Sequence, residues 1–168
     1  MTVVTPVQPE HIEAFAALAE EMDRFYGVTD SGPLDVRLRQ INDVLFGDPP
    51  SAYALLAWID GRPVGFAAYS FLWPAVGFTR SVFLKELYVI ETARRTGVGK
   101  AIMRSLAEVA VKNDCSRLEW QTDTPNTDAQ RFYEDLGVDV NGSKLSYRAQ
   151  GEALRRLANE QAGDGPAS

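Results

Sequence analysis

Residues 84–100 read LKELYVIETARRTGVGK, and this stretch decides the fold class and the place to look for chemistry. An apolar, strand-forming run leads into a loop that contains Arg94, Gly97 and Gly99, and helical spacing begins directly afterwards. The first N–H groups of a helix have no partner within it, and they lie at the positive end of the helix dipole. Glycines allow a ligand to approach such a backbone closely. We therefore expect a phosphate or pyrophosphate at this helix start.

Two glycines alone leave a plainer interpretation open, namely a flexible turn between a strand and a helix. The spacing does disfavour a nucleotide-binding domain. A G-x-x-x-x-G-K-[ST] loop that ends at Gly99-Lys100 would need glycine where Arg94 stands, and Ala101 follows the lysine. A G-x-G-x-x-G loop would need glycine at Ile102.

Residues 118–138 read LEWQTDTPNTDAQRFYEDLGV and form a second informative stretch. Asn126 follows a predicted strand and precedes a predicted helix, so capping of that helix is one role open to it. Phe132 and Tyr133 lie on the helix, where aromatic residues commonly pack into a core. From the residues alone, structural and chemical roles remain open for both Asn126 and Tyr133.

The hydrophobic pattern predicts a mixed α/β fold, with antiparallel strands first and a βαβ unit later. The Asp60-Gly61 pair predicts a tight hairpin. Expected strands cover residues 2–6, 52–59, 63–70, 82–89 and 117–122, followed by a last antiparallel pair at 138–140 and 145–148. Expected helices cover residues 10–26, 34–45, 98–112 and 127–136.

Length and composition indicate one folded domain. The chain has 168 residues, of which 45% are apolar and 24% charged, as in ordinary globular proteins. We assign residues 1–150 to a single domain and residues 151–168 to a tail that begins helical and ends frayed. Cys115 is the only cysteine, which excludes an internal disulfide, and His11 is the only histidine, so no metal site is expected.

The charge balance limits the partners. Seventeen basic against 23 acidic residues give a net charge of −6. No basic stripe is present, so we expect no nucleic-acid partner. The longest uncharged run, residues 63–79, is too short and too interrupted to span a membrane. The first ten residues lack the pattern of a signal peptide, and we expect a cytoplasmic protein.

Together, the two stretches resemble the GNAT superfamily of N-acetyltransferases, most of all its diamine (spermidine/spermine) branch and the bacterial relatives of that branch. The first stretch matches the acetyl-CoA motif Arg/Gln-x-x-Gly-x-Gly/Ala at Arg94, Gly97 and Gly99. The second matches the family pattern at Asn126, Ala129, Phe132, Tyr133 and Gly137. The resemblance is specific over residues 84–138.

This resemblance implies a twisted, mostly antiparallel sheet of about six to seven strands with helices on both faces. Acetyl-CoA would be the co-substrate, lying where the strands at 82–89 and 117–122 splay apart. Backbone groups of Leu87, Tyr88 and Val89 would hold the pantetheine and the thioester carbonyl, and the loop amides would hold the pyrophosphate. The implied cofactor-binding residues are Leu87, Tyr88, Val89, Arg94, Arg95, Thr96, Gly97, Val98, Gly99, Lys100 and Asn126.

The resemblance also implies catalytic roles. Tyr133 would protonate the leaving thiolate of CoA, and Glu86 would deprotonate the attacking amine, directly or through water. A salt-bridged surface acid remains an alternative for Glu86. The diamine branch often has two successive acids at this point, but the first of them is Lys85 here. That departure weakens both the assignment of the base and the assignment of a polyamine acceptor.

The first two helices, their loop and a strand connection form the acceptor side in this family. Glu21, Tyr26 and Trp73 are the implied substrate-binding residues. Acids next to aromatic rings suit a cationic amine, which can be a small molecule or part of a peptide. A solvated helix face remains open for Glu20, Glu21 and Asp23. The resemblance allows a homodimer, and the alternative function is a non-catalytic module that binds or senses acyl-CoA.

Overall fold

The computed structural model describes residues 1–138, 140–143 and 145–159. Its strands are β1 (Thr2–Pro6), β2 (Tyr53–Ile59), β3 (Arg62–Leu72), β4 (Arg80–Val89) and β5 (Cys115–Trp120). Its α-helices are α1 (Ile12–Phe25), α2 (Leu34–Phe46), α3 (Val98–Lys112), α4 (Thr127–Glu134) and α5 (Gly151–Asn159). Three short 3-10 helices that the sequence analysis did not predict are η1 (Pro9–His11), η2 (Val76–Phe78) and η3 (Glu91–Ala93).

Backbone contacts divide the chain into two compact units, residues 1–130 and 131–168. This division falls inside α4. The expected domain boundary at residue 150 stays a prediction.

The first unit contains a five-stranded sheet in the order β1-β2-β3-β4-β5. The first three pairings are antiparallel, and β4 pairs with β5 in parallel through the crossover helix α3. The β2–β3 turn has positive φ angles at Asp60 (50°) and Gly61 (74°), as a tight hairpin turn requires. The predicted mixed α/β class, with its antiparallel start and later βαβ unit, is confirmed.

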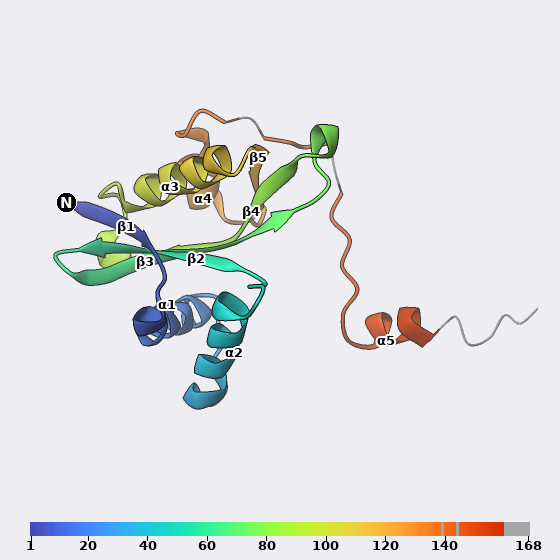
Figure 1. The fold of residues 1–168 in the computed structure, drawn as a ribbon, viewed down its shortest axis with the longest axis horizontal. Helices are drawn as coiled ribbons and strands as arrows, with labels where there is room; N and C mark the ends of the chain where they lie inside the picture. Colours follow the sequence, from blue (N-terminus) through green and yellow to red (C-terminus); the bar gives the residue numbers. More distant parts are fainter. Residues whose placement is uncertain (139, 144, 160–168) are drawn as a thin grey trace, which may run out of the picture. The chain divides into compact units, whose positions relative to one another are not determined.

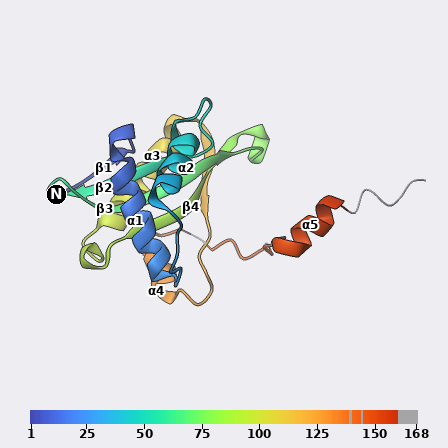
Figure 2. The same cartoon turned by 90° about the horizontal axis from the view of Figure 1, so that it is seen from below.

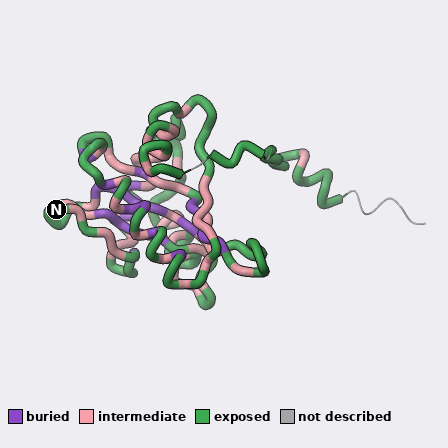
Figure 3. Tube along the Cα trace, turned by 90° about the horizontal axis from the view of Figure 1, so that it is seen from above, coloured by how far each residue is buried: buried purple, intermediate pink, exposed green. Residues whose placement is uncertain are grey.

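Helices cover both faces of this sheet. Figures 1 and 2 show α1 and α2 along one face, and Figure 1 shows α3 on the opposite face. Buried residues concentrate in the central strands, as Figure 3 shows. The buried side of α3 is made of Val98, Ile102, Met103, Leu106 and Ala110, which repeat at helical spacing.

The strand register builds the core beneath α1. Leu56, Phe66 and Tyr88 are direct partners across β2, β3 and β4, so their side chains lie in one row on one face. From α1, Phe15 packs edge-on against Phe66, with ring centroids 4.9 Å apart. Burial of each such side chain contributes about 1.5–3 kcal/mol. This row anchors Tyr88, and therefore the part of β4 that the sequence analysis assigned to chemistry.

The expected last strand pair is wrong. Residues 138, 140 and 145–148 form no strand in the structure, while Asp139, part of the first expected strand, lies outside the described residues. The described sheet therefore has five strands rather than six to seven. Val140 and Leu145 are 84% and 83% exposed, and a lone hairpin without an apolar surface to pack on is marginal in water. The tail begins helical, as predicted, and its expected frayed end lies outside the described residues.

Candidate functional site

The parallel strands β4 and β5 separate part-way along β4. Their last paired residues are Leu84 and Trp120, where β5 ends, whereas β4 continues to Val89. Beyond this point Glu86–Val89 are paired only with β3, and Lys85 lies at a shift in the register. This open edge is the splay that the resemblance implied, and it presents backbone groups that a ligand can bind.

Alternation along β4 decides which backbone groups face the open edge. The N–H of Ile90 donates to the carbonyl of Val64 on the β3 side, at 3.0 Å. In an antiparallel pair, successive residues alternate between bonding the partner strand and facing away from it. Tyr88 therefore bonds β3, while the N–H and C=O groups of Leu87 and Val89 face the open edge. Leu87 and Val89 are thus the residues whose backbone groups are free to meet a ligand at this edge, and the expected contact from Tyr88 stays a prediction.

Gly65 confirms this orientation. A Cβ built on this glycine would lie 2.6 Å from the carbonyl oxygen of Tyr88, so that carbonyl points toward β3. The glycine thus allows β3 and β4 to approach closely directly beside the site.

The loop between β4 and α3 is held by its own hydrogen bonds. Arg94 Nε donates to the carbonyl of Val89 at 2.9 Å, and Thr96 Oγ1 donates to the carbonyl of Ala93 at 2.7 Å. The chain then turns through Gly97, whose φ of 93° favours glycine, and α3 begins at Val98. Glycine at this position therefore sets the angle at which the helix starts.

The start of α3 fits a pyrophosphate group. Within the described part of the chain, the amides of Val98, Gly99 and Lys100 have no hydrogen-bond acceptor. Side chains of Arg95 and Lys100 are exposed beside them and add positive charge. These are the components of an anion site at a helix N-terminus. The guanidinium of Arg94 does not join them, because it lies over the rings of Phe25 and Tyr88.

The end of α1 packs against β4 through a charged and aromatic group of side chains. The hydroxyl of Tyr88 donates to Glu21 Oε1 at 2.9 Å. The guanidinium of Arg94 lies 4.7 Å from the ring centroid of Phe25 and 5.8 Å from that of Tyr88. Burial, followed by the bond to Glu21, raises the pKa of Tyr88, and Arg94 opposes this rise.

Glu86 lies on the same face as Tyr88. It pairs with Ala68, whose side chain packs against the core beneath α1, and it is two residues from Tyr88. Partial burial, followed by the negative charges of Glu86 and Asp123, raises the pKa of Tyr26, while Arg94 lowers it. We call Glu21, Tyr26, Glu86 and Asp123 the acidic cluster.

The acidic cluster includes one residue that the sequence analysis missed. Asp123 follows the end of β5, and the carboxyl ends of strands in an open α/β sheet are a usual place for ligand-binding side chains. That position was the signal available in the sequence. A surface ion pair of 3.7 Å joins Glu86 to Lys85, with side chains 38% and 69% exposed, and such a pair holds a carboxylate only weakly.

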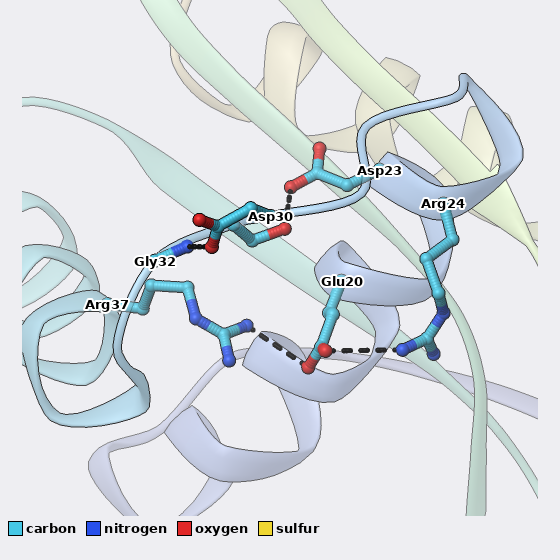
Figure 4. A network of polar contacts seen from close by, with 7 residues as sticks. Glu20, Asp23, Arg24, Asp30, Gly32 and Arg37 are labelled. Carbon is cyan, nitrogen blue, oxygen red and sulfur yellow. Dashed lines mark hydrogen bonds and ion pairs between the residues drawn. The ribbon is translucent and has the colours of Figure 1, made fainter.

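Two other acids of α1 have a structural use. Figure 4 shows Glu20 bridging Arg24 and Arg37, at 3.2 Å each. Asp23 accepts a hydrogen bond of 2.8 Å from the hydroxyl of Ser31. These contacts tie α1 to α2 and to the loop between them. Glu20 and Asp23 are therefore neither a merely solvated face nor part of the acidic cluster.

Within the first unit, Trp73 lies far from the acidic cluster. It lies in the connection after β3 and donates from Nε1 to the carbonyl of Phe78 at 2.9 Å. The neighbouring strand pair ends at Leu72 and Ser81. Glu86 lies five positions beyond Ser81 on β4, which is about 17 Å along a strand. The sequence could not show this, because the register sets the distance.

Asn126 and Tyr133 belong to the ends of α4. The side-chain oxygen of Asn126 accepts from the amide of Ala129 at 3.1 Å, which is the capping role left open by the sequence. Tyr133 lies in the second unit, where its ring is 5.0 Å from that of Phe132.

Among the described residues, no helix is both long and apolar enough to cross a membrane. Across residues 1–138, 140–143 and 145–159, no three His, Cys, Asp or Glu side chains come together in a way that could hold a metal ion.

Comparisons with known proteins agree with this geometry. Residues 15–138 match the model of the acetyltransferase (GNAT) family. The thialysine N-epsilon-acetyltransferase of Mus musculus is 34% identical over 124 residues, covering 67% of this chain and 72% of that protein. The aminoglycoside N(6')-acetyltransferase type 1 of Serratia marcescens is 28% identical over 121 residues, covering 70% and 82%.

The fold has a counterpart among solved structures. An integron cassette protein from the mobile metagenome of V. cholerae has a TM-score of 0.79 and 25% identity, with 94% of this chain and 97% of that one covered. The family model spans both the splayed strands and the start of α3. This chain therefore belongs to the acetyltransferase (GNAT) family and is an acetyl-CoA-dependent N-acetyltransferase.

Proposed function

We propose that this enzyme transfers the acetyl group of acetyl-CoA directly to a primary amine that carries further positive charge. The observation that supports this most is the acidic cluster next to the open edge of β4. The negative charges of Glu86 and Asp123 act on the phenol of Tyr26, with Arg94 as the nearby cation, and Glu21 accepts the hydrogen bond from Tyr88. Net negative charge beside aromatic rings attracts a cationic acceptor.

The open edge and the loop bind the co-substrate in this proposal. Backbone groups of Leu87 and Val89 hydrogen-bond the pantetheine and orient the thioester. Amides of Val98, Gly99 and Lys100 bind the pyrophosphate, while Arg95 and Lys100 add long-range attraction. Asn126 completes the binding surface at the start of α4, in addition to its capping bond.

Glu86 acts as the general base. An amine is mostly protonated at neutral pH and must lose a proton before its lone pair can attack the thioester carbon. Glu86 accepts that proton directly or through one water, and its partly exposed carboxylate allows both routes. Its face of β4, shared with Tyr88, places the base on the side of α1, where the acceptor binds.

Tyr133 acts as the general acid. As the new C–N bond forms and the C–S bond breaks, negative charge develops on the sulfur of CoA. The phenol of Tyr133 donates its proton to that sulfur. The nitrogen starts as an ammonium and loses two protons. The first passes through Glu86 to solvent, and the second, lost as the tetrahedral intermediate collapses to the amide, balances the proton that Tyr133 gives to the sulfur. No covalent acyl-enzyme is required. Cys115 takes no part in this scheme.

The acceptor is a small molecule with at least two cationic groups. One amine faces Glu86 and reacts. The second pairs with Glu21 or Asp123 and lies against the ring of Phe25 or Tyr26. The relatives named for thialysine and for aminoglycosides act on molecules of this general kind, which supports the choice of class. Trp73 is left out of the acceptor site because of its distance.

Release of free thiol from acetyl-CoA, measured with a panel of amines, tests the proposal. We expect turnover with thialysine or an aminoglycoside, and little with neutral or acidic amines. Glu86→Gln should lower kcat by about 10²–10⁴-fold, the usual worth of a general base. The matched control is Glu13→Gln, an exposed acid of the same charge near the start of α1.

Two outcomes would count against this function. Tight CoA binding with no thiol release for any amine would favour the acyl-CoA-sensing module. Full turnover in Glu86→Gln at saturating substrates would show that water or another group is the base.

A further inference from the structure

Arg94 joins two parts of the site that lie in different elements. Its backbone belongs to the loop before α3, which binds CoA in the proposed function. Its side chain extends away from that loop to Phe25 at the end of α1 and to Tyr88 on β4. We propose that Arg94 is a positioning residue that couples CoA binding to the order of the acceptor side. This inference rests on the proposed function of the loop and the acidic cluster.

The orientation of the guanidinium is set by two kinds of contact. The Nε–H donates to the carbonyl of Val89 at 2.9 Å, which fixes the plane of the group. That carbonyl belongs to the open edge of β4. The same group then lies 4.7 Å from the ring centroid of Phe25. A lysine cannot reproduce this combination, because it lacks both the planar group and the Nε–H.

The end of α1 is the element that this contact restrains. The helix closes with the amide of Tyr26 bonded to the carbonyl of Met22 at 3.1 Å, and that of Val28 bonded to Asp23 at 2.9 Å. Phe25 is 57% exposed, and besides Arg94 its ring contacts those of Tyr26 and Tyr88, with centroids 5.2 and 6.4 Å away. Tyr26 belongs to the acidic cluster, and Glu21 lies one turn earlier on the same helix. Movement of Phe25 therefore moves the acceptor side directly.

Coupling follows from this arrangement. When CoA fixes the loop, the backbone of Arg94 becomes fixed, and its side chain restrains Phe25 and the last turn of α1. The acceptor then meets an ordered surface. By thermodynamic linkage, an acceptor that orders α1 strengthens CoA binding by the same factor. The consequence is positive coupling between the two substrates.

Hydrogen–deuterium exchange measured with and without CoA tests this coupling without any need for turnover. In the wild type, CoA should slow exchange at the start of α3, residues 98–101, and also at residues 26–28. We expect the second effect to be about two- to fivefold, the size of one exposed cation–π contact. In Arg94→Met and in Phe25→Leu, the effect at 26–28 should disappear while that at 98–101 persists.

Matched variants separate positioning from general damage. Arg24→Met removes a guanidinium from the same helix end, where it makes only an exposed ion pair with Glu20, and it should keep the CoA effect at 26–28. The double variant of Arg94 and Phe25 should behave like either single one. If Arg94→Met does not fold, Arg94→Lys gives the same comparison with the charge retained.

Steady-state kinetics with thialysine as the probe adds a second readout. Arg94→Met, which removes no group proposed to touch the acceptor, should raise the KM for thialysine several-fold while the Kd for CoA alone stays unchanged. A direct effect of charge would act in the opposite direction, because Arg94 repels a cationic acceptor. CoA protection at 98–101 without protection at 26–28 in the wild type would overturn the coupling alone. No CoA protection at either place would instead overturn the proposed function of the loop.

Discussion

Tyr133 carries the sharpest prediction at the scale of one residue. Replacement by phenylalanine keeps the ring that packs beside Phe132 and removes only the hydroxyl. If that hydroxyl protonates the leaving thiolate, Tyr133→Phe should lower kcat by about 10²-fold, the low end for general acids, because a thiolate already leaves readily. Single-turnover rates and the Kd for CoA measure the effect, and the Kd should stay the same.

A Phe132→Leu variant serves as the packing control for Tyr133, since it alters the neighbouring ring and leaves the hydroxyl. Unchanged single-turnover chemistry in Tyr133→Phe would reduce this tyrosine to a packing residue.

The raised pKa of Tyr88 should make the free energy of unfolding depend on pH. Burial and the bond to Glu21 raise its pKa above the ordinary 10.0, so the folded state resists forming the phenolate. Its contribution to stability is complete below pH 10 and is lost as the pH rises through the folded-state pKa. The free energy of unfolding should therefore fall less between pH 8 and 11 in Tyr88→Phe than in the wild type.

Urea titrations at the two pH values measure this difference for Tyr88. Tyr147→Phe is the matched control, because it removes the same hydroxyl from a residue that is 89% exposed. Parallel pH curves for wild type and Tyr88→Phe would contradict the prediction.

At the scale of elements, the site depends on the close approach of β3 and β4. Gly65→Ala would place a methyl group 2.6 Å from the carbonyl oxygen of Tyr88, which is backbone and cannot turn aside. We expect a loss of about 1–3 kcal/mol in the free energy of unfolding, as for other overpacked positions. Chemical denaturation measures it.

The control for Gly65 is Gly142→Ala, where an added Cβ meets nothing within 4 Å, and a change within about 0.5 kcal/mol is expected. If both substitutions change the free energy of unfolding equally, β4 can shift to admit the added methyl group. The position of the open edge would then be less rigid than the strand register indicates.

The start of α3 shows which elements the sequence predicts well. Its strand, loop and helix are contiguous, and the predicted bounds of the helix, residues 98–112, are those observed. Apolar spacing and one glycine with positive φ are local properties, so tertiary contacts are not needed to predict them. The hairpin at Asp60 was predictable for the same reason.

The expected strand pair near Val140 failed because a strand exists only with a partner. Alternating apolar residues indicate that a segment can join a sheet, but the pairing itself is a tertiary event. The same limit explains Trp73. Its residue type suits a cationic acceptor, yet the register of β3 and β4 puts it at the other end of the sheet.

At the scale of the whole molecule, the sequence by itself determined the order of elements as far as α4, the mixed sheet and the loop before α3 where an anion site is proposed. Each of these depends on neighbours a few residues apart, or on a motif whose parts are adjacent. Glu86 could also be picked out, as an acid close to Tyr88 on one strand.

Only the tertiary structure decided the composition of the acidic cluster and the direction of Arg94. Glu21 and Tyr88 are 67 residues apart and meet because a row of apolar partners packs α1 onto β4. Arg94 turns to Phe25 because a cation over an aromatic ring, with its Nε–H satisfied, is a favourable arrangement that only the packed helix makes available. The sequence gives the chemical type of each side chain, but tertiary packing sets the distances between side chains that act together.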